Sequence, residues 1–218
     1  MKRILITTLL SSSLLLSTAA VAQQQAPIPP TLLQRIRQLL GLVQPVAAGG
    51  SRGDSKQLCL ISPYVASTQQ GAITPTATPT IRVLQPLNEV RIEKDGRPLW
   101  RKVASSTQAI NGLVTWPLPP LQPGEQVFLV LRPRGAAGAD LARVPLQAAS
   151  AEVLAQTRMV LDNISDNQEA WEAAMGQALQ SNNKALAVVL LNARSKGASG
   201  SSAALEQLIQ STACQGTP

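Results

Sequence analysis

The stretch EVRIEKDGRPLW at residues 89–100 predicts a β-hairpin. Apolar Val90 and Ile92 alternate with charged Arg91 and Glu93, which is the period of a strand with one buried and one exposed face. The Asp-Gly pair in the middle of the stretch favours a tight two-residue turn, because both residues tolerate a positive φ. We therefore expect two antiparallel strands joined at this turn.

Short β-prone runs, punctuated by proline and glycine, extend this pattern over residues 58–148. Such spacing is typical of an immunoglobulin-like antiparallel β-sandwich. The run at 126–132 is apolar on both faces, which indicates a central strand. The predicted strands are 58–62, 80–84, 89–94, 98–103, 112–117, 126–132 and 142–147.

The hydrophobic period becomes helical over residues 149–218. Brief breaks separate four amphipathic segments, so we expect a small antiparallel helical tail and an α+β fold class. Asp166 and Glu169 predict a capping box for the second helix. Residues 51–149 carry 11 basic and 6 acidic groups, whereas residues 150–218 carry 4 and 6. This charge difference favours docking of the tail on the sandwich. The predicted helices span 153–164, 170–178, 186–193 and 205–209.

Residues 1–22 have the pattern of a signal peptide. Basic Lys2 and Arg3 precede an apolar stretch at 4–16, and Ala-Val-Ala at 20–22 forms a cleavage site. We therefore expect an exported protein, periplasmic or secreted, that begins at residue 23.

A proline-rich lead, an amphipathic helix and a Gly/Ser linker are predicted within residues 23–57. Apolar residues recur at helical spacing over 31–43, and Thr31 with Gln34 forms a possible capping box. Two interpretations stay open for this helix. In the first, the helix docks on a partner or on a membrane surface, and the membrane contact would make the protein membrane-peripheral. In the second, its apolar stripe packs on the protein's own core.

Cys59 and Cys214 are the two cysteines of the chain. In an oxidising compartment an even number of thiols favours pairing. Their bond would close a loop of 155 residues, since 214 − 59 = 155, and remove up to about 5 kcal/mol of unfolded-state entropy. The alternatives are two buried free thiols or intermolecular bonds.

Composition excludes several kinds of site. The 218 residues include no histidine, which removes Ser-His and Cys-His nucleophile pairs and imidazole zinc sites. Two cysteines cannot form a four-thiolate site. We therefore expect no metal and no cofactor. The net charge is +7, yet five aromatic residues offer few stacking platforms, so nucleic acid is not an expected partner.

Three motifs carry a resemblance to a known family. They are GGSRG at 49–53, DGxPLW at 95–100 and WPLPPLQPGE at 116–125. With an exported N-terminus and Leu-rich helices at the end, this layout resembles a cyanobacterial family of exported cell-envelope proteins of unknown function. The resemblance implies a sandwich followed by helices and does not imply an activity.

The acidic residues Asp162, Asp166, Glu169 and Glu172 could supply the acid and base of a carboxylate-based hydrolase. Helix capping explains the same residues more simply, because acidic groups favour helix N-termini. Ser181 and Lys184 match the S-x-x-K motif of acyl-serine enzymes, but the motifs that accompany it are absent from the sequence, and Ser181 is more simply explained as a helix N-cap. No catalytic residue is therefore predicted.

Arginines on the predicted strands suggest an anionic partner. Arg97, Arg101 and Arg132 would form an anion-binding face beside Trp100 if strand alternation brings them together, whereas Arg91 is expected on a solvated face. We expect an exported, non-enzymatic binding or scaffold protein of the cell envelope. Its partner would be a protein or an anionic envelope polymer, and its oligomeric state stays open.

Overall fold

The fold is seen in a computed structural model, which describes residues 28–49, 56–66, 71–138, 140–164, 167–195 and 200–215. The predicted signal peptide at 1–22 and Asp166 lie outside the described residues. The elements, in chain order, are α1 (Pro30–Gly41), β1 (Val46–Ala48), β2 (Lys56–Leu58), β3 (Leu60–Ser62), β4 (Ala72–Thr74), β5 (Ile81–Lys94), β6 (Arg97–Val103), β7 (Ile110–Val114), β8 (Gln126–Pro133), β9 (Ala142–Ala148), α2 (Ala151–Ile164), α3 (Gln168–Gln180), α4 (Lys184–Ser195) and α5 (Gly200–Thr212).

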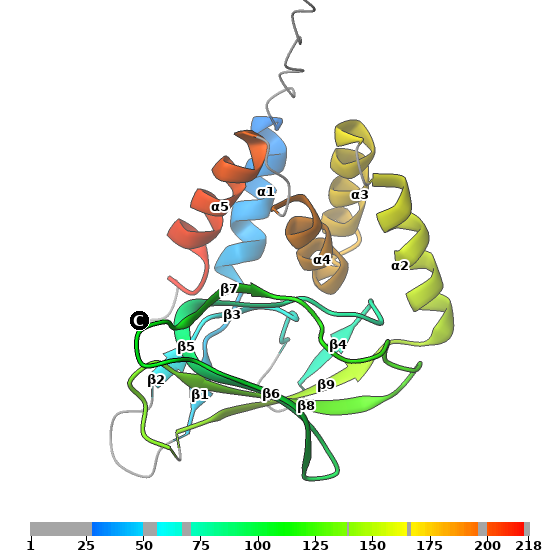
Figure 1. Ribbon diagram of the computed structural model, residues 1–218. Helices are drawn as coiled ribbons and strands as arrows, with labels where there is room; N and C mark the ends of the chain where they lie inside the picture. The colour runs from blue at the N-terminus through cyan, green and yellow to red at the C-terminus, as the bar shows by residue number, and fades with distance from the viewer. Residues whose placement is uncertain are drawn as a thin grey trace, which may run out of the picture.

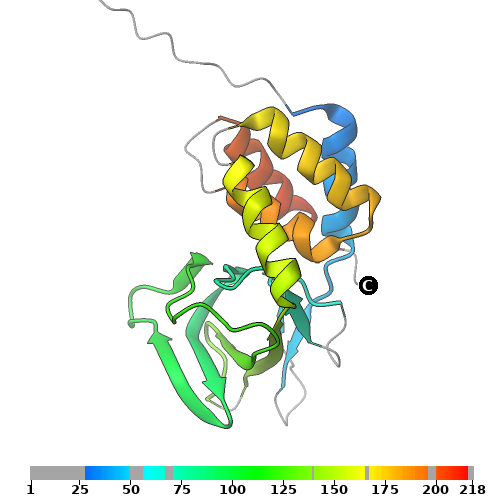
Figure 2. The same cartoon turned by 90° about the vertical axis from the view of Figure 1, so that its right-hand side faces the viewer.

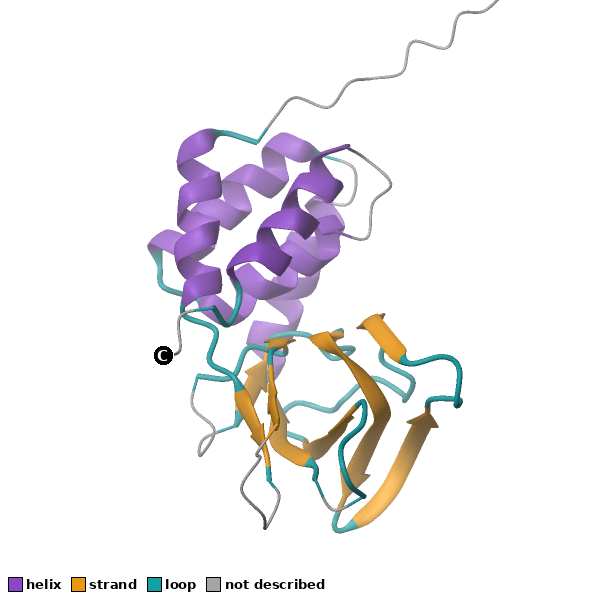
Figure 3. Ribbon diagram, turned by 90° about the vertical axis from the view of Figure 1, so that its left-hand side faces the viewer, coloured by secondary structure: helices purple, strands orange, loops and turns teal. Residues whose placement is uncertain are grey.

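The helices lie together on one side of the strands (Figures 1 and 3). Seven strands form one mixed sheet with the order β3-β5-β8-β9-β4, and β6 and β7 pair with β5 as well. β5 is 14 residues long and shifts register near its middle. Its first half pairs with β3 and β7 and its second half with β6 and β8, so the sheet curls around its own core.

The α+β class and a helical segment after the strands are as predicted, but an immunoglobulin-like sandwich is not confirmed. The sequence predicts separate strands at 80–84 and 89–94, whereas the structure shows one strand that continues through Pro86. A proline is tolerated there because the strand pairing is irregular at this point. The sheet is also not purely antiparallel, since β4 pairs with β9 in parallel.

The hairpin prediction is confirmed. Lys94 pairs with Arg97, and Asp95 and Gly96 have φ values of 51° and 75°. Both values lie in the left-handed region that a two-residue hairpin turn of this kind requires. The predicted linker at 44–57 contains two strands instead, because β1 pairs with β2. Residues 50–55 of this linker lie outside the described residues.

Four helices follow the sheet, as predicted, but their caps differ from the prediction. Asn167 caps α3, accepting a hydrogen bond from the backbone N–H of Ala170 at 3.0 Å, and Glu169 lies in the first turn. Ser181 is not the predicted N-cap but ends α3: its hydroxyl donates to the carbonyl of Gln177 at 2.9 Å. α1 begins after Pro29 without a side-chain cap, so the predicted capping box at its start is wrong.

Two hydrophobic cores are present, one inside the curled sheet and one among the helices. β3 and the first half of β5 separate them. Leu60 and Val83 belong to the sheet core, while Ile61 and Leu84 pack in the helical core. These strands are mostly apolar on both faces because each face covers a different core, and Arg82 is the charged residue on the side of the helices.

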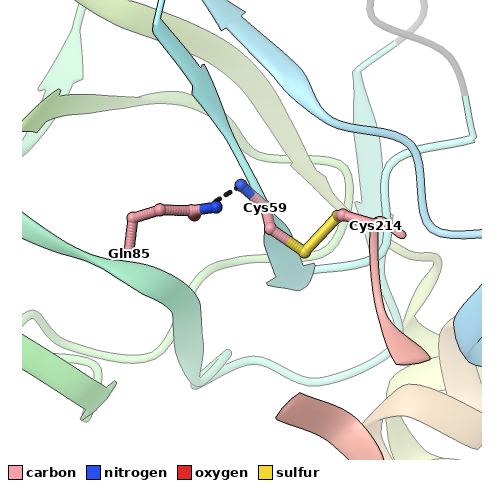
Figure 4. Close-up of a disulfide and its surroundings, with 3 residues drawn as sticks. All are labelled: Cys59, Gln85 and Cys214. Atoms are coloured by element: carbon pink, nitrogen blue, oxygen red, sulfur yellow. Dashed lines mark hydrogen bonds between the residues drawn. A yellow bond between two sulfur atoms is a disulfide. The ribbon is translucent and has the colours of Figure 1, made fainter. Parts of the chain in front are cut away.

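A disulfide and an ion pair join the helices to the sheet. The sulfurs of Cys59 and Cys214 lie at bonding distance, 2.12 Å, in agreement with the predicted pairing (Figure 4). The bond links the junction of β2 and β3 to the end of α5. Arg82 of β5 forms an ion pair with Glu206 of α5 and donates to Asn192 Oδ1 of α4 at 3.2 Å. A basic strand residue thus binds an acidic helix residue, the pairing that the charge difference favours.

Candidate binding sites

A groove of about 630 Å³ opens between α2, α4 and the segment that joins β4 to β5. Its volume lies in the range of small-molecule sites in proteins. It is larger than a second cavity, of about 420 Å³, that includes residues of α1 and α3. The groove is lined by Ser62, Thr76, Ala77, Thr78, Thr80, Pro120, Leu154, Ala155, Arg158, Leu161, Asp162, Val189, Asn192 and Ala193.

α2 forms one wall of the groove. It leaves the sheet just after β9 and runs along the other helices (Figure 2). Leu154, Arg158 and Leu161 recur at spacings of four and three, so they share one helix face. Only Thr157 and Ile164 of this helix are buried, whereas Leu154 and Leu161 are half-buried. α2 therefore turns Leu154 and Leu161 toward the groove, beside the exposed Arg158, and leaves both leucines only partly covered.

The other walls combine apolar and uncharged polar groups. Val189 and Ala193 of α4 stand beside Asn192, whose side chain is buried. The Ser62 hydroxyl donates to the carbonyl of Thr80 at 2.6 Å. Hydroxyl and amide groups of this kind orient a ligand by hydrogen bonds while the apolar walls exclude water.

A second surface carries six charged side chains on the outer face of the sheet, opposite the sheet core. We call it the Arg–Glu network, and it consists of Arg91, Arg101, Arg132, Arg143, Glu89 and Glu93.

Glu89 is the centre of the Arg–Glu network, with a side chain only 4% exposed. Arg101 donates Nε and Nη2 to the two carboxylate oxygens at 2.8 and 3.1 Å. Arg132 and Arg91 approach the same carboxylate at 3.3 and 3.4 Å. The hydrogen bond from Arg101, supported by the charges of all three arginines, lowers the pKa of Glu89 although burial opposes this. The hydrogen bond to Glu89, together with the negative charge of that carboxylate, raises the pKa of Arg101.

Glu93 completes the network. Arg91 Nε lies 2.8 Å from one oxygen of Glu93, and Arg143 Nη2 lies 3.4 Å from the other. The Arg143 guanidinium also stacks over the ring of Phe128, 4.0 Å from its centre. Four arginines therefore surround two carboxylates on one face of the sheet.

The predicted anion-binding face is assembled in part. The structure brings Arg101 and Arg132 together on Glu89, but it places Arg97 beside the hairpin turn, without an ion pair among the described residues. Trp100 packs partly against the sheet core. Arg143 was not predicted to belong to this face, and Arg91 was predicted to lie on a solvated face. The alternation of Glu89, Arg91 and Glu93 was the signal that could have identified the network.

The candidate acid–base residues do not share the groove. Asp162 lines the groove, and its Oδ2 lies 3.8 Å from Nε of Arg158. Glu169 and Glu172 belong to α3 instead. Glu172 accepts a hydrogen bond from Gln168 at 2.8 Å. Asp166 lies outside the described residues. Within the described ranges, no group of three or more His, Cys, Asp or Glu residues is arranged to hold a metal ion.

The helix predicted at 31–43 packs against the protein itself. Ile36 and Leu40 of α1 are fully buried in the helical core, with Trp171 and Met175 of α3. Leu42 is the apolar residue of this segment that stays exposed. The structure favours internal packing over membrane docking for the apolar stripe. None of the helices in the described part of the chain is long and apolar enough to cross a bilayer.

Comparisons with protein-family models, with curated proteins and with solved structures found no match for this chain. Fold and sites therefore define its class on their own: an α+β protein in which a disulfide joins a helical layer to a curled mixed sheet, with an open groove between them.

Proposed function

We propose that this protein is an exported, non-enzymatic binding protein that holds a small, mainly apolar molecule in the groove between α2 and α4. The observation that carries the proposal is the pair of half-buried leucines on α2, Leu154 and Leu161, which line an open groove of about 630 Å³. A bound apolar molecule would cover this surface and stabilise the helix.

The uncharged polar groups of the groove indicate the chemistry of the ligand. Asn192 and the hydroxyls of Thr76 and Thr78 can pair with a hydroxyl, ether or carbonyl group. Arg158 and Asp162 lie 3.8 Å apart and offset each other's charge. The ligand we propose has an apolar body and an uncharged polar group.

Export to an oxidising compartment is supported by two independent features. The signal-peptide pattern at 1–22 predicts translocation. A bond between Cys59 and Cys214 is stable where thiols are not kept reduced. The resemblance to exported cyanobacterial envelope proteins is in keeping with this compartment. The absence of histidine from the sequence supports binding rather than catalysis.

Titration with the uncharged fluorescent probe N-phenyl-1-naphthylamine tests the proposal. Ala193 is exposed on the α4 wall, so Ala193→Trp would fill the groove without disturbing either core. We expect this variant to bind the probe about tenfold more weakly, or worse, which corresponds to at least 1.4 kcal/mol of binding free energy.

Ala173→Trp is the matched control, because Ala173 is exposed on α3 and lines neither cavity described above. It should bind the probe like the wild-type protein. Equal affinities of the wild-type protein and the Ala193→Trp variant, or a wild-type protein that does not bind the probe, would contradict the proposal.

A further inference from the structure

We propose that the Arg–Glu network is a second binding site, independent of the groove, for a linear acidic polysaccharide. The first observation is its charge. Arg91, Arg101, Arg132 and Arg143 supply four positive charges, and Glu89 and Glu93 supply two negative charges. The six side chains of the network therefore carry a net charge of +2, which favours an external anion.

The strand register sets three of these arginines in a row across the sheet, and Arg132 lies beside the row, opposite Glu89. Arg101 of β6 pairs with Arg91 of β5, Arg91 with Val130 of β8, and Val130 with Arg143 of β9. Adjacent strands lie about 4.8 Å apart, so the row extends over about 14 Å. Like charges on directly opposed residues repel each other, and anions bound along the row would relieve that repulsion.

The two ends of the row are the accessible positions. The side chains of Arg101 and Arg143 are 54% and 50% exposed, whereas those of Arg91 and Arg132 are 24% and 21% exposed. Glu89 holds Arg101 from one side, and Glu93 with the Phe128 ring holds Arg143. Guanidinium groups fixed in this way lose little conformational entropy when they bind a carboxylate or sulfate group in a bidentate manner.

The composition of the face selects the kind of polyanion. Val130, in the middle of the row, is only 2% exposed, and the Arg143 guanidinium lies over the Phe128 ring. The row therefore offers cations, and Val103, the exposed apolar residue opposite Glu89, is of a type that seldom anchors a protein partner. It also lacks a free aromatic ring on which a nucleic-acid base could stack, since Trp100 packs partly against the sheet core. A polymer with regular carboxylate or sulfate groups fits this chemistry best.

The test measures binding of the full chain to polygalacturonate, which carries carboxylates, to dextran sulfate, and to neutral dextran at low ionic strength. We expect binding to both acidic polymers, weakened by added salt, and none to neutral dextran. The double variant Arg101→Gln/Arg143→Gln should bind the acidic polymers about tenfold more weakly. Its fold should persist, because Arg91 still pairs with both Glu89 and Glu93.

Arg35→Gln/Arg37→Gln is the matched control, because it removes the same charge from exposed positions of α1. It should bind like the wild-type protein. If both double variants bind the acidic polymers equally weakly, the binding depends only on net charge, and the proposal is overturned. So would a wild-type protein that binds neither acidic polymer, or that binds single-stranded DNA more tightly than both. Thermal unfolding of each variant checks that the fold is retained.

Discussion

Glu89 is the residue on which most of the Arg–Glu network depends, since three arginines approach its nearly buried carboxylate. Glu89→Gln keeps the shape of the side chain and removes its charge. Arg91 then keeps its ion pair with Glu93, whereas Arg101 and Arg132 lose the carboxylate that they contact. We expect a loss of about 1–3 kcal/mol in the free energy of unfolding at neutral pH. Urea unfolding of the two proteins measures it.

The same residue predicts a pH dependence. A lowered pKa means that the folded protein holds the charged carboxylate more firmly than the unfolded chain does. The stabilisation by Glu89 is therefore complete above the ordinary carboxyl pKa and is lost as the pH falls through the lowered value. The gap in stability between the wild-type protein and Glu89→Gln should narrow below about pH 4. A gap that stays constant on acidification would show that the charge of Glu89 is not the cause.

At the scale of single residues, the sequence predicts what depends on neighbours along the chain. The turn at Asp95 and Gly96 needs only the local preference for positive φ, so it was predictable. The partners of Arg101 depend on the registers of β5, β6 and β8, which no local pattern specifies. Helix caps are predictable only in part, because the sequence offers candidate residues but does not fix where the helix begins. Asn167 and Asp166 are adjacent candidates, and the exact first residue of the helix decides between them.

Among the secondary-structure elements, α1 is the one whose predicted role differs most from what the structure shows. The sequence presents an isolated amphipathic helix, but Ile36 and its neighbours complete the core formed by α3, α4 and α5. Ile36→Ala should destabilise the protein by about 2–4 kcal/mol, because the side chain is fully buried.

Arg37→Ala, at the next position on the exposed side of α1, serves as the control and should change stability by less than about 0.5 kcal/mol. Chemical denaturation compares the two. If Ile36→Ala unfolds at the same denaturant concentration as the wild-type protein, then α1 is not part of the core, and membrane docking of its apolar stripe becomes the better interpretation.

The strands show why the sheet could be predicted only in part. Strong runs such as 126–132 and 142–147 were predicted to within one residue of β8 and β9. β1 and β4 were missed, because three residues are too few to display a period. The continuity of β5 through Pro86 was missed because proline normally ends a strand interior.

In the molecule as a whole, the ends of the described chain come together. α1 packs beside α5, and the bond between Cys59 and Cys214 fixes the end of α5 to the sheet. Closing a loop of 155 residues in the unfolded chain accounts for up to about 5 kcal/mol of stability in the loop-entropy model. The spacing of the two cysteines in the sequence is enough to predict this contribution to stability.

The groove was not predictable, because its walls come from separate segments near residues 76–80, 154–162 and 189–193.

Hydrogen–deuterium exchange with N-phenyl-1-naphthylamine bound tests most directly whether this groove is the binding site of the protein. We expect slower amide exchange in 76–80, 154–162 and 189–193, because the bound probe would hold α2 against α4 and limit the local unfolding of α2. Slower exchange confined to 35–42 and 178–184, the walls of the smaller cavity, would contradict it. So would a bound probe that changes exchange in none of these segments.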